Sequence, residues 1–302
     1  MSLKVSILMN GYNCEKFVVE AISSVVRQTY SNWEIVFVDN CSTDNTKPLI
    51  MAFDDVRIKY VNTPINIPLG EARSFGLEFC DGDFVCFLDT DDLWVASKLA
   101  EQLKLFHSFP DLKMVYTGGE FIDESGDVIG EFIPKAIGDD VFEQQLVRYE
   151  VNQQSVMIRN NFSFEIDKSK KYSVDFSLFM PICAFHKVRA IKAKMIKYRL
   201  HSSNFSHNAG ELEWLEQKDT LDAIFDNRPS LKSDYKKGYR HAYARVSYYK
   251  ARYLFSIGEN FSARKILFKH AFVGVFYFSL LILSFFPASV WLRLHKKVRR
   301  FS

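Results

Sequence analysis

The sequence lacks the motifs that mark several common classes of protein. Its five cysteines are odd in number and never spaced as C-x-x-C, so we interpret them as small buried side chains in a reducing compartment. No G-x-G-x-x-G follows the first predicted strand, and no G-x-x-x-x-G-K-[ST] occurs, which excludes phosphate binding by a glycine-rich loop. The first residues also lack the basic flank and apolar length of a signal peptide, so we expect the chain to start in the cytoplasm.

A large excess of charge of one sign is also missing. The 302 residues carry a formal net charge of +3, which does not suit a nucleic-acid-binding protein. The charge is distributed unevenly along the chain. Residues 1–130 hold 10 basic and 20 acidic residues, whereas residues 232–302 hold 15 basic and 2 acidic ones. The 28 phenylalanines provide more apolar surface than one soluble core requires. Charge and apolar surface therefore indicate a chain whose two ends differ in function.

Short apolar runs alternate with helical patterns through the first 110 residues. Buried strands are predicted at 5–9, 34–38, 58–61 and 84–88, and helices at 15–29, 45–53, 69–80 and 93–106. This alternation predicts an α/β fold with a mostly parallel, Rossmann-like sheet flanked by helices. Ligands of such folds bind at the carboxyl ends of the strands, where this sequence has Asn10, Asp39 and the acidic run Asp89–Asp92.

The acidic run Asp-Thr-Asp-Asp at 89–92 is the strongest local signal. Its three carboxylates repel one another unless a cation neutralises them, and hard oxygen ligands suit Mg²⁺ or Mn²⁺ held together with substrate phosphates. The alternative is an acidic turn in which Asp92 is the N-cap of the 93–106 helix. Both interpretations can hold at once.

Other polar residues stand at or near the same predicted strand ends. Asn10, Tyr12 and Asn13 offer an aromatic face and amide groups to a nucleobase, Asp39 offers a carboxylate to a base N–H, and Arg73 offers a guanidinium to a phosphate. Each has a structural alternative: Tyr12 as a core residue, Asp39 in a turn, and Arg73 in a surface ion pair. Together they indicate one nucleotide-binding crevice.

Five motifs in order and at matching spacing make residues 3–110 resemble the family 2 glycosyltransferases. The motifs are residues 5–13 (VSILMNGYN), 21–30 (AISSVVRQTY), 33–44 (WEIVFVDNCSTD), 72–77 (ARSFGL) and 87–94 (FLDTDDLW). The resemblance implies a GT-A fold, an inverting transfer, a nucleotide-diphosphate sugar donor (a UDP-sugar foremost) and a divalent metal, Mn²⁺ or Mg²⁺. It also implies a hexosyl- or N-acetylhexosaminyltransferase.

The resemblance assigns roles to residues that match the family's motifs. Donor-binding positions are Asn10, Tyr12, Asn13, Asp39, Asp44, Arg73, Asp89, Asp91, Arg199 and His201, and metal-binding positions are Asp91, Asp92 and His201. The sequence departs from the family pattern at four of its motif positions: Asn10 for Thr or Pro, Asn40 for Asp, Cys41 for Gly, and Ser74 for Asn.

An inverting transfer needs a carboxylate that takes the proton from the acceptor hydroxyl. Family members place it in a Glu-Asp pair before an aromatic-rich helix, where this chain keeps only Asp175 after Val174. Asp175 is therefore the predicted base, with a helix N-cap as its alternative, while Asp123 and Glu124 fit an exposed turn. The segment 197–206 (KYRLHSSNFS) resembles the Tyr-Arg-x-His stretch that closes the catalytic domain, and places Arg199 and His201 near the diphosphate or metal.

The C-terminal part is predicted to be helical and to contact a membrane. We expect a catalytic domain over 1–210 and an α-helical extension over 211–302. Residues 271–292 contain no formal charge, Pro287 divides them, and a basic cluster follows at 293–300. This pattern favours a helix lying in the interface of an anionic membrane over a spanning helix, with a helix packed on the catalytic domain as the alternative.

These features predict an enzyme at the cytoplasmic face of the inner membrane that glycosylates a lipid-linked saccharide of a surface polysaccharide or glycoprotein pathway. Two other functions stay open. One is a nucleotidyltransferase, although the Asn10–Asn13 segment is a poor basic glycine-rich loop. The other is a non-catalytic membrane adaptor with a degenerate transferase fold, because Val174 replaces the usual Glu.

Overall fold

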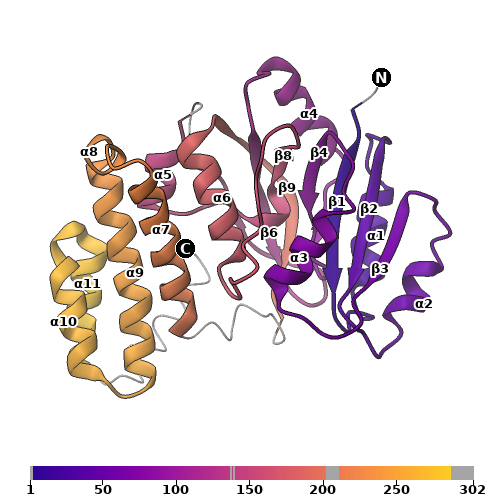
Figure 1. The fold of residues 1–302 in the computed structure, drawn as a ribbon. Coiled ribbons are helices and arrows are strands. Elements are labelled where there is room, and N and C mark those ends of the chain that lie inside the picture. The colour runs from indigo at the N-terminus through magenta and orange to yellow at the C-terminus, as the bar shows by residue number, and fades with distance from the viewer. Residues whose placement is uncertain (1–2, 137, 139, 202–210, 287–302) are drawn as a thin grey trace. The chain divides into compact units, whose positions relative to one another are not determined.

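The computed structural model describes residues 3–136, 138, 140–201 and 211–286 (Figure 1). The described residues group into two compact units. The first contains those within 1–141 and 150–204, and the second contains those within 142–149 and 205–302.

The first unit is a mixed sheet with helices, and its strands are joined in the order β3-β2-β1-β4-β8-β6-β9-β5, with β7 paired to β6. Its strands are β1 (Val5–Gly11), β2 (Trp33–Asp39), β3 (Ile58–Asn62), β4 (Phe84–Phe87), β5 (Leu93–Trp94), β6 (Met114–Ile122), β7 (Val128–Phe132), β8 (Met157–Arg159) and β9 (Val188–Arg199). Its helices are α1 (Val18–Val26), α2 (Thr46–Met51), α3 (Leu69–Leu77), α4 (Lys98–Ser108), η1 (Gln153–Ser155) and α6 (Val174–Phe185).

The four N-terminal strands are parallel, as the sequence predicts. β1 pairs with β2 and β4, and β2 pairs with β3, all in parallel register. The later strands extend the sheet beyond β4 and make it mixed, since β8 is antiparallel to β4 and β6, whereas β9 is parallel to β6. The α/β class with C-terminal helices is therefore confirmed.

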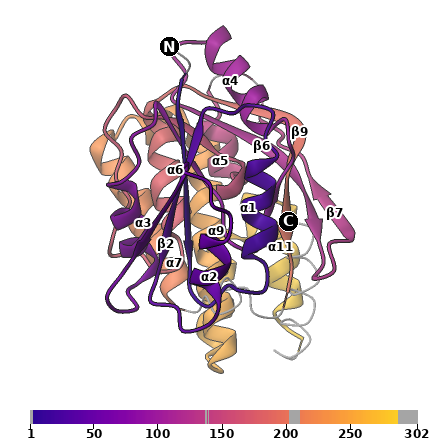
Figure 2. The ribbon, with the colours of Figure 1, turned by 90° about the vertical axis from the view of Figure 1, so that its right-hand side faces the viewer.

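Helices cover both faces of this sheet. Successive side chains of a strand point to opposite faces, so apolar residues of one strand pack against helices on either side. Val5, Ile7 and Met9 of β1 join the core cluster that contains the apolar residues of α1 and α4. On the other face α3 approaches closely: a Cβ on Gly76 would lie 2.5 Å from side-chain atoms of both Leu8 and Val38. Figure 2 shows α1 and α3 on opposite sides of the central strands.

The predicted start of the fourth helix is wrong. Leu93–Trp94 forms the short strand β5, antiparallel to β9, and the helix begins at Lys98 with Ser97 as its N-cap residue. Trp94 is 5% exposed, and its indole N–H donates to the carbonyl of Gln154 at 2.9 Å. Pairing with β9 and burial of this indole favour the extended conformation over a first helical turn, so Asp92 is not an N-cap.

The second unit is helical. It contains α7 (Glu211–Asn227), α8 (Leu231–Asp234), α9 (Lys236–Ser256), α10 (Asn260–His270), η3 (Ala271–Val273) and α11 (Val275–Leu283), together with α5 (Phe142–Val147) from the middle of the chain. Gly238 of α9 lets α5 approach, since a Cβ there would lie 2.9 Å from the Cβ of Leu146. The Nη1 of half-buried Arg245 donates to the carbonyls of Gln145 and Leu146, which caps the C-terminal end of α5.

The last described helices carry exposed phenylalanines. Exposed fractions are 80% for Phe261, 63% for Phe268, 77% for Phe272 and 69% for Phe285. Among the described residues no helix combines the length and the apolar character that crossing a membrane requires. The remainder of the predicted tail, with Pro287 and the basic cluster at 293–300, lies outside the described residues.

Candidate active site

The strand ends meet along one edge of the parallel sheet. Gly11 at the end of β1 is in register with Asp39 at the end of β2, and the chain after β4 runs directly into the acidic turn 89–92. Because the three strands are adjacent and parallel, the polar residues that follow them share this edge. The strand-end predictions for Asn10, Asp39 and the acidic run therefore fall on neighbouring strands.

Asp89 of the acidic turn is hydrogen-bonded through both of its carboxylate oxygens. Its Oδ1 accepts from Nη2 of Arg73 at 2.9 Å, and Nε of Arg73 donates to Oδ1 of Asn10 at 3.4 Å. Two glutamines of η1 complete the environment, with Nε2 of Gln154 at 2.5 Å from Oδ2 and Nε2 of Gln153 at 3.4 Å from Oδ1. Arg73, which is 7% exposed, thus bridges two of the predicted donor-binding residues.

Gln153 and Gln154 were not predicted from the sequence. They lie in a short 3-10 helix behind the acidic turn, more than 60 positions later in the chain. Isolated glutamines match no motif, and only the packing of η1 against β4 places them beside Asp89. Their only signal in the sequence is that the run Asn152-Gln153-Gln154 stands between the apolar Val151 and the strand β8.

Asp91 and His201 lie close together although 110 positions separate them. Nε2 of His201 is 2.9 Å from Oδ2 of Asp91, and the imidazole is tilted against the ring of Phe17 at 5.3 Å between centroids. Burial and the neighbouring charge of Asp89 raise the pKa of Asp91, while His201 lowers it in part. The sequence-predicted association of this histidine with the acidic run is therefore present in the fold.

Asp92 is buried beneath the turn, with 1% of its surface exposed. Its Oδ1 accepts the backbone N–H of Arg199 at 2.7 Å, and its Oδ2 accepts no hydrogen bond from any residue that the structure describes. Burial raises the pKa of Asp92 well above its ordinary value, and the charges of Asp91 and Asp89 raise it further. A buried carboxylate oxygen without a donor is a group that a cation would satisfy.

The residues of the acidic turn fit a divalent cation that is shared with a substrate diphosphate. Within the described ranges no three His, Cys, Asp or Glu side chains are grouped so that they could hold a metal ion. Asp91 and His201 nevertheless converge, and Mg²⁺ and similar cations are held by one or two carboxylates together with substrate phosphates. The chemistry of the predicted metal-binding residues is therefore compatible with part of a coordination shell, which a diphosphate would have to complete.

The β2 end is organised by Asp39. Its Oδ1 accepts the N–H of Ser42 at 2.8 Å, and its Oδ2 accepts the hydroxyl of Tyr60 at 2.5 Å. Asn40, which replaces a family Asp, has its amide bound to both the N–H and the carbonyl of Ile67. Asn40 therefore holds the loop after β3 and is itself engaged by the protein.

Cys41 takes the place of a family Gly and keeps a glycine-like backbone. Its φ is +66°, in the left-handed region that costs a residue with a Cβ about 1–2 kcal/mol. The turn after β2 therefore has a backbone conformation that a glycine would adopt without this cost.

The remaining predicted donor-binding residues have different surroundings. Tyr12 is 53% exposed, so its ring is accessible and is not a core residue. Asn13 braces two loops, since its Oδ1 accepts the N–H of Thr43 at 2.8 Å and its own N–H donates to Oγ of Ser42. Burial alone would raise the pKa of Asp44, but hydrogen bonds from Thr46 and Glu15 lower it below its ordinary value.

Asp175 lies in the first turn of α6, where Ser173 occupies the N-cap position, so the N-cap interpretation of Asp175 is wrong. Burial raises its pKa, and the nearby charge of Asp89 raises it further, while a backbone hydrogen bond and the charge of Arg73 lower it in part. The carboxyl group is thus within electrostatic range of the two residues that form the Arg73–Asp89 ion pair. Asp123 and Glu124 lie in the β6–β7 turn, as predicted.

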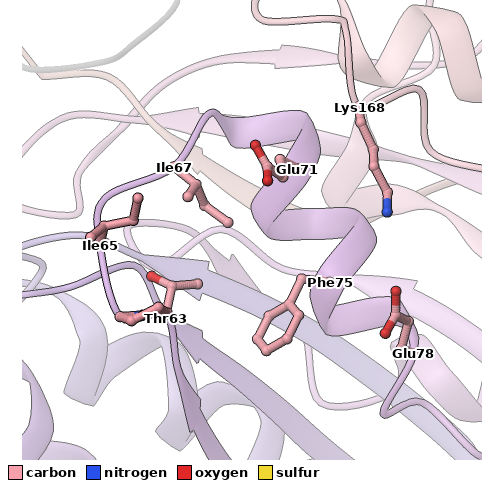
Figure 3. Close-up of a pocket in the computed structure, with 8 residues that line it drawn as sticks. Thr63, Ile65, Ile67, Glu71, Phe75, Glu78 and Lys168 are labelled. Carbon is pink, nitrogen blue, oxygen red and sulfur yellow. The ribbon is translucent and has the colours of Figure 1, made fainter.

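A separate pocket of about 340 Å³ lies along α3 (Figure 3). Glu71, Phe75 and Glu78 line it at helical spacing, with Ile65 from the preceding loop and Lys168 opposite. Arg73 lies two positions from both Glu71 and Phe75 and therefore points to a different face of the helix. None of the sequence-predicted site residues lines this pocket.

Comparisons with known proteins found relatives in sequence and in fold. A sequence model described as glycosyl transferase family 2 matches residues 6–163. WfgD of Escherichia coli, a UDP-Glc:alpha-D-GlcNAc-diphosphoundecaprenol beta-1,3-glucosyltransferase, is 32% identical over 230 residues, which cover 74% of this chain and 87% of WfgD.

Two solved structures are similar in fold. The complex of Staphylococcus aureus TarS residues 1–349 with UDP-GlcNAc has a TM-score of 0.67 at 14% identity and covers 99% of this chain and 92% of that chain. The mannosyltransferase PcManGT of Pyrobaculum calidifontis, in complex with GDP-Man and Mn²⁺, has a TM-score of 0.55 at 15% identity and covers 96% of this chain and 83% of that chain.

Proposed function

The chain belongs to glycosyl transferase family 2, and we propose that it transfers a sugar from a UDP-sugar to a hydroxyl group of a lipid-linked saccharide. The observation that carries this proposal is the convergence of Asp89, Asp91 and His201 at the carboxyl edge of the parallel strands. WfgD, whose name specifies UDP-Glc and a diphosphoundecaprenol-linked acceptor, supports both substrates, since the alignment spans most of both chains.

The donor site is proposed to extend along this edge from the base to the diphosphate. Exposed Tyr12 would stack on the base, and Asp39 and Asp44 would accept from base and ribose. Asn10, Arg73 and Asp89 form a connected set beside the sugar-diphosphate, and the loop braced by Asn13 shapes the entrance. These roles extend the sequence predictions to the observed contacts.

Asp91 and His201, with Asp92 behind them, are proposed to hold Mn²⁺ or Mg²⁺ with the donor diphosphate. When bound, such a cation neutralises negative charge on the departing diphosphate. The presence of Mn²⁺ in the PcManGT complex supports a divalent cation in this fold.

Asp175 is proposed to take the proton from the attacking acceptor hydroxyl. The new bond joins the acceptor oxygen to the anomeric carbon, the bond from that carbon to the diphosphate breaks, and its electron pair leaves with the nucleoside diphosphate. Attack opposite the leaving group inverts the anomeric configuration. A raised pKa suits this role, because a more basic carboxylate accepts the proton more readily.

Product analysis with purified full-length chain tests the proposed reaction. We expect UDP release from a UDP-sugar with Mn²⁺, slow without acceptor and increased at least about 100-fold by a synthetic diphospholipid-linked sugar, because the positioned hydroxyl replaces water. A nucleotidyltransferase would instead release pyrophosphate from a nucleoside triphosphate and a sugar phosphate. A non-catalytic adaptor would release neither product. Either of these two results would contradict the proposal.

The first unit is proposed to be the catalytic domain and the second to bring it to the cytoplasmic face of the inner membrane. Phe261, Phe268, Phe272 and Phe285 are the most exposed phenylalanines of the second unit's described residues and support contact with acyl chains. Lys265 and Lys269 of α10 add basic groups near them in sequence, and the cluster at 293–300 adds more. A peripheral attachment would place the enzyme beside its lipid-linked acceptor.

Flotation with anionic vesicles tests this attachment. We expect the double variant Phe272→Asp/Phe285→Asp to lose at least about tenfold in vesicle binding, since burial of each phenyl ring stabilises by about 1.5–3 kcal/mol. The control Val56→Asp changes a fully exposed apolar residue of the first unit and should float as the wild type does. Unchanged flotation of the double variant would contradict membrane contact through these rings.

A further inference from the structure

Arg199, the last residue of β9, is a buried cation beneath the acidic turn. Its side chain is 1% exposed, and its guanidinium donates in three directions. Nε donates to the carbonyl of Asp91 at 2.9 Å, Nη1 to the carbonyl of Glu124 at 3.0 Å, and Nη2 to the Oε2 of Glu20 at 2.7 Å. All three guanidinium nitrogens are therefore bound to protein acceptors.

These contacts join three elements that lie far apart in the sequence. Glu20 belongs to α1, Glu124 to the β6–β7 turn, and Asp91 to the acidic turn. The backbone N–H of Arg199 adds a fourth contact, to the Oδ1 of Asp92 at 2.7 Å. One residue thus fixes the backbone of Asp91 and the carboxylate of Asp92 at the same time.

The ring of Phe17 supports Arg199 and His201 together. The guanidinium carbon lies 4.6 Å from the ring centroid, and the imidazole centroid lies 5.3 Å from it. His201 stands two positions after Arg199, the spacing that puts side chains on one side of an extended chain. The residue that fixes the Asp91 backbone and the residue that contacts the Asp91 carboxylate therefore share one support.

We propose that Arg199 is a positioning residue for the cation–diphosphate site and does not itself contact the donor. Arg199 orients Asp91 toward His201 by holding the backbone of the turn. This requires several donors in one fixed plane, which the guanidinium group of Arg provides and the ammonium group of Lys does not. The proposal rests on the proposed function, because it concerns the same Asp91–His201 site. This positioning role differs from the role that the family resemblance implies for Arg199, which is direct contact with the diphosphate.

Binding measurements on the full-length chain with Arg199→Lys test this role. We expect the Mn²⁺ dissociation constant, measured by electron paramagnetic resonance with UDP present, to rise about 10–100-fold, the usual effect of losing a supporting contact. UDP affinity without metal should stay unchanged. The matched control is Arg159→Lys, because Arg159 also donates to two backbone carbonyls and lies over aromatic rings. It pairs with Phe84 at the start of β4, whereas the acidic turn follows the other end of that strand.

Each alternative result has a defined meaning. Unchanged Mn²⁺ affinity in Arg199→Lys would overturn the proposal, even if the melting temperature falls as it does in Arg159→Lys. An equal loss of UDP affinity with and without metal would also overturn it, since that is the signature of direct donor contact.

Should Arg199→Lys not fold, Glu20→Gln decides: Glu20 is 58% exposed in its side chain, and its variant should weaken Mn²⁺ binding about 3–10-fold. Unchanged binding in Glu20→Gln would then refute the positioning role. A wild-type chain that binds neither Mn²⁺ nor UDP would contradict the proposed function itself.

Discussion

Replacing Asp175 by Asn is expected to lower kcat about 10³-fold while the donor KM changes little. The amide has almost the volume of the carboxyl group, so the first turn of α6 should keep its packing. It cannot accept the acceptor's proton, and proton transfer by a positioned base contributes about 10²–10⁴ to a rate. Steady-state UDP release with saturating acceptor and donor measures this loss.

The pH profile gives a second, independent readout of Asp175. The base acts when it is deprotonated, so kcat should fall as the pH decreases through its pKa. Burial and the charge of Asp89 raise that pKa, so the acid limb should lie above the ordinary carboxyl range near about 4. Glu165→Gln, an exposed carboxylate in the loop before α6, is the matched control and should show wild-type kcat and profile. An Asp175→Asn enzyme with more than about a tenth of wild-type kcat would assign the base elsewhere.

Replacing Asp91 by Ala should abolish turnover, with a loss of about 10³-fold or more in kcat/KM. The carboxylate belongs to the acidic turn, and its Oδ2 lies 2.9 Å from Nε2 of His201. Wild-type activity should disappear in EDTA and return with Mn²⁺, whereas Asp91→Ala should not respond to Mn²⁺. UDP release and a Mn²⁺ titration measure both effects.

The control for Asp91→Ala is Asp111→Ala, because Asp111 is an aspartate of the same unit that is 80% exposed in its side chain and forms an ion pair with Lys187. It should retain full activity and the same response to Mn²⁺. Circular dichroism should show that both variants keep the wild-type helix and strand content. Turnover by Asp91→Ala, or by the wild type in EDTA, would remove the metal from the mechanism.

Local sequence patterns predicted those parts of the site that depend on one strand and the residues that follow it. Asn10, Asp39 and Asp89 each come at the end of a short apolar run, and parallel pairing is enough to place such ends on one edge. His201 and Asp175 required the family resemblance, because neither stands in a local pattern that distinguishes it from a structural residue. Their distance to the acidic turn depends on how β9 and α6 pack.

Contacts between distant segments account for what the sequence did not predict. Leu93–Trp94 followed an acidic turn that resembles a helix start, but β9 provides a pairing partner about 100 positions later and keeps these residues extended. Gln153 and Gln154 gain their place beside Asp89 only through the packing of η1. Arg199 looked like a donor-binding cation by its motif, and only the structure shows that its nitrogens are bound to Glu20, Asp91 and Glu124.

The packing of α5 with α9 has a consequence for the biosynthesis of the chain. Phe142 and Leu146 are at most 1% exposed in the finished unit, yet α9 ends at Ser256, 109 residues after α5 ends at Val147. At about 5–20 residues per second, a ribosome needs roughly 5–20 s to add that stretch. During this interval the face of α5 that packs on α9 lacks that partner, although Phe225 of α7, which contacts Phe142, is made earlier. A messenger truncated before α9 would make that exposure permanent and turn an enzyme into a substrate for chaperones and proteases.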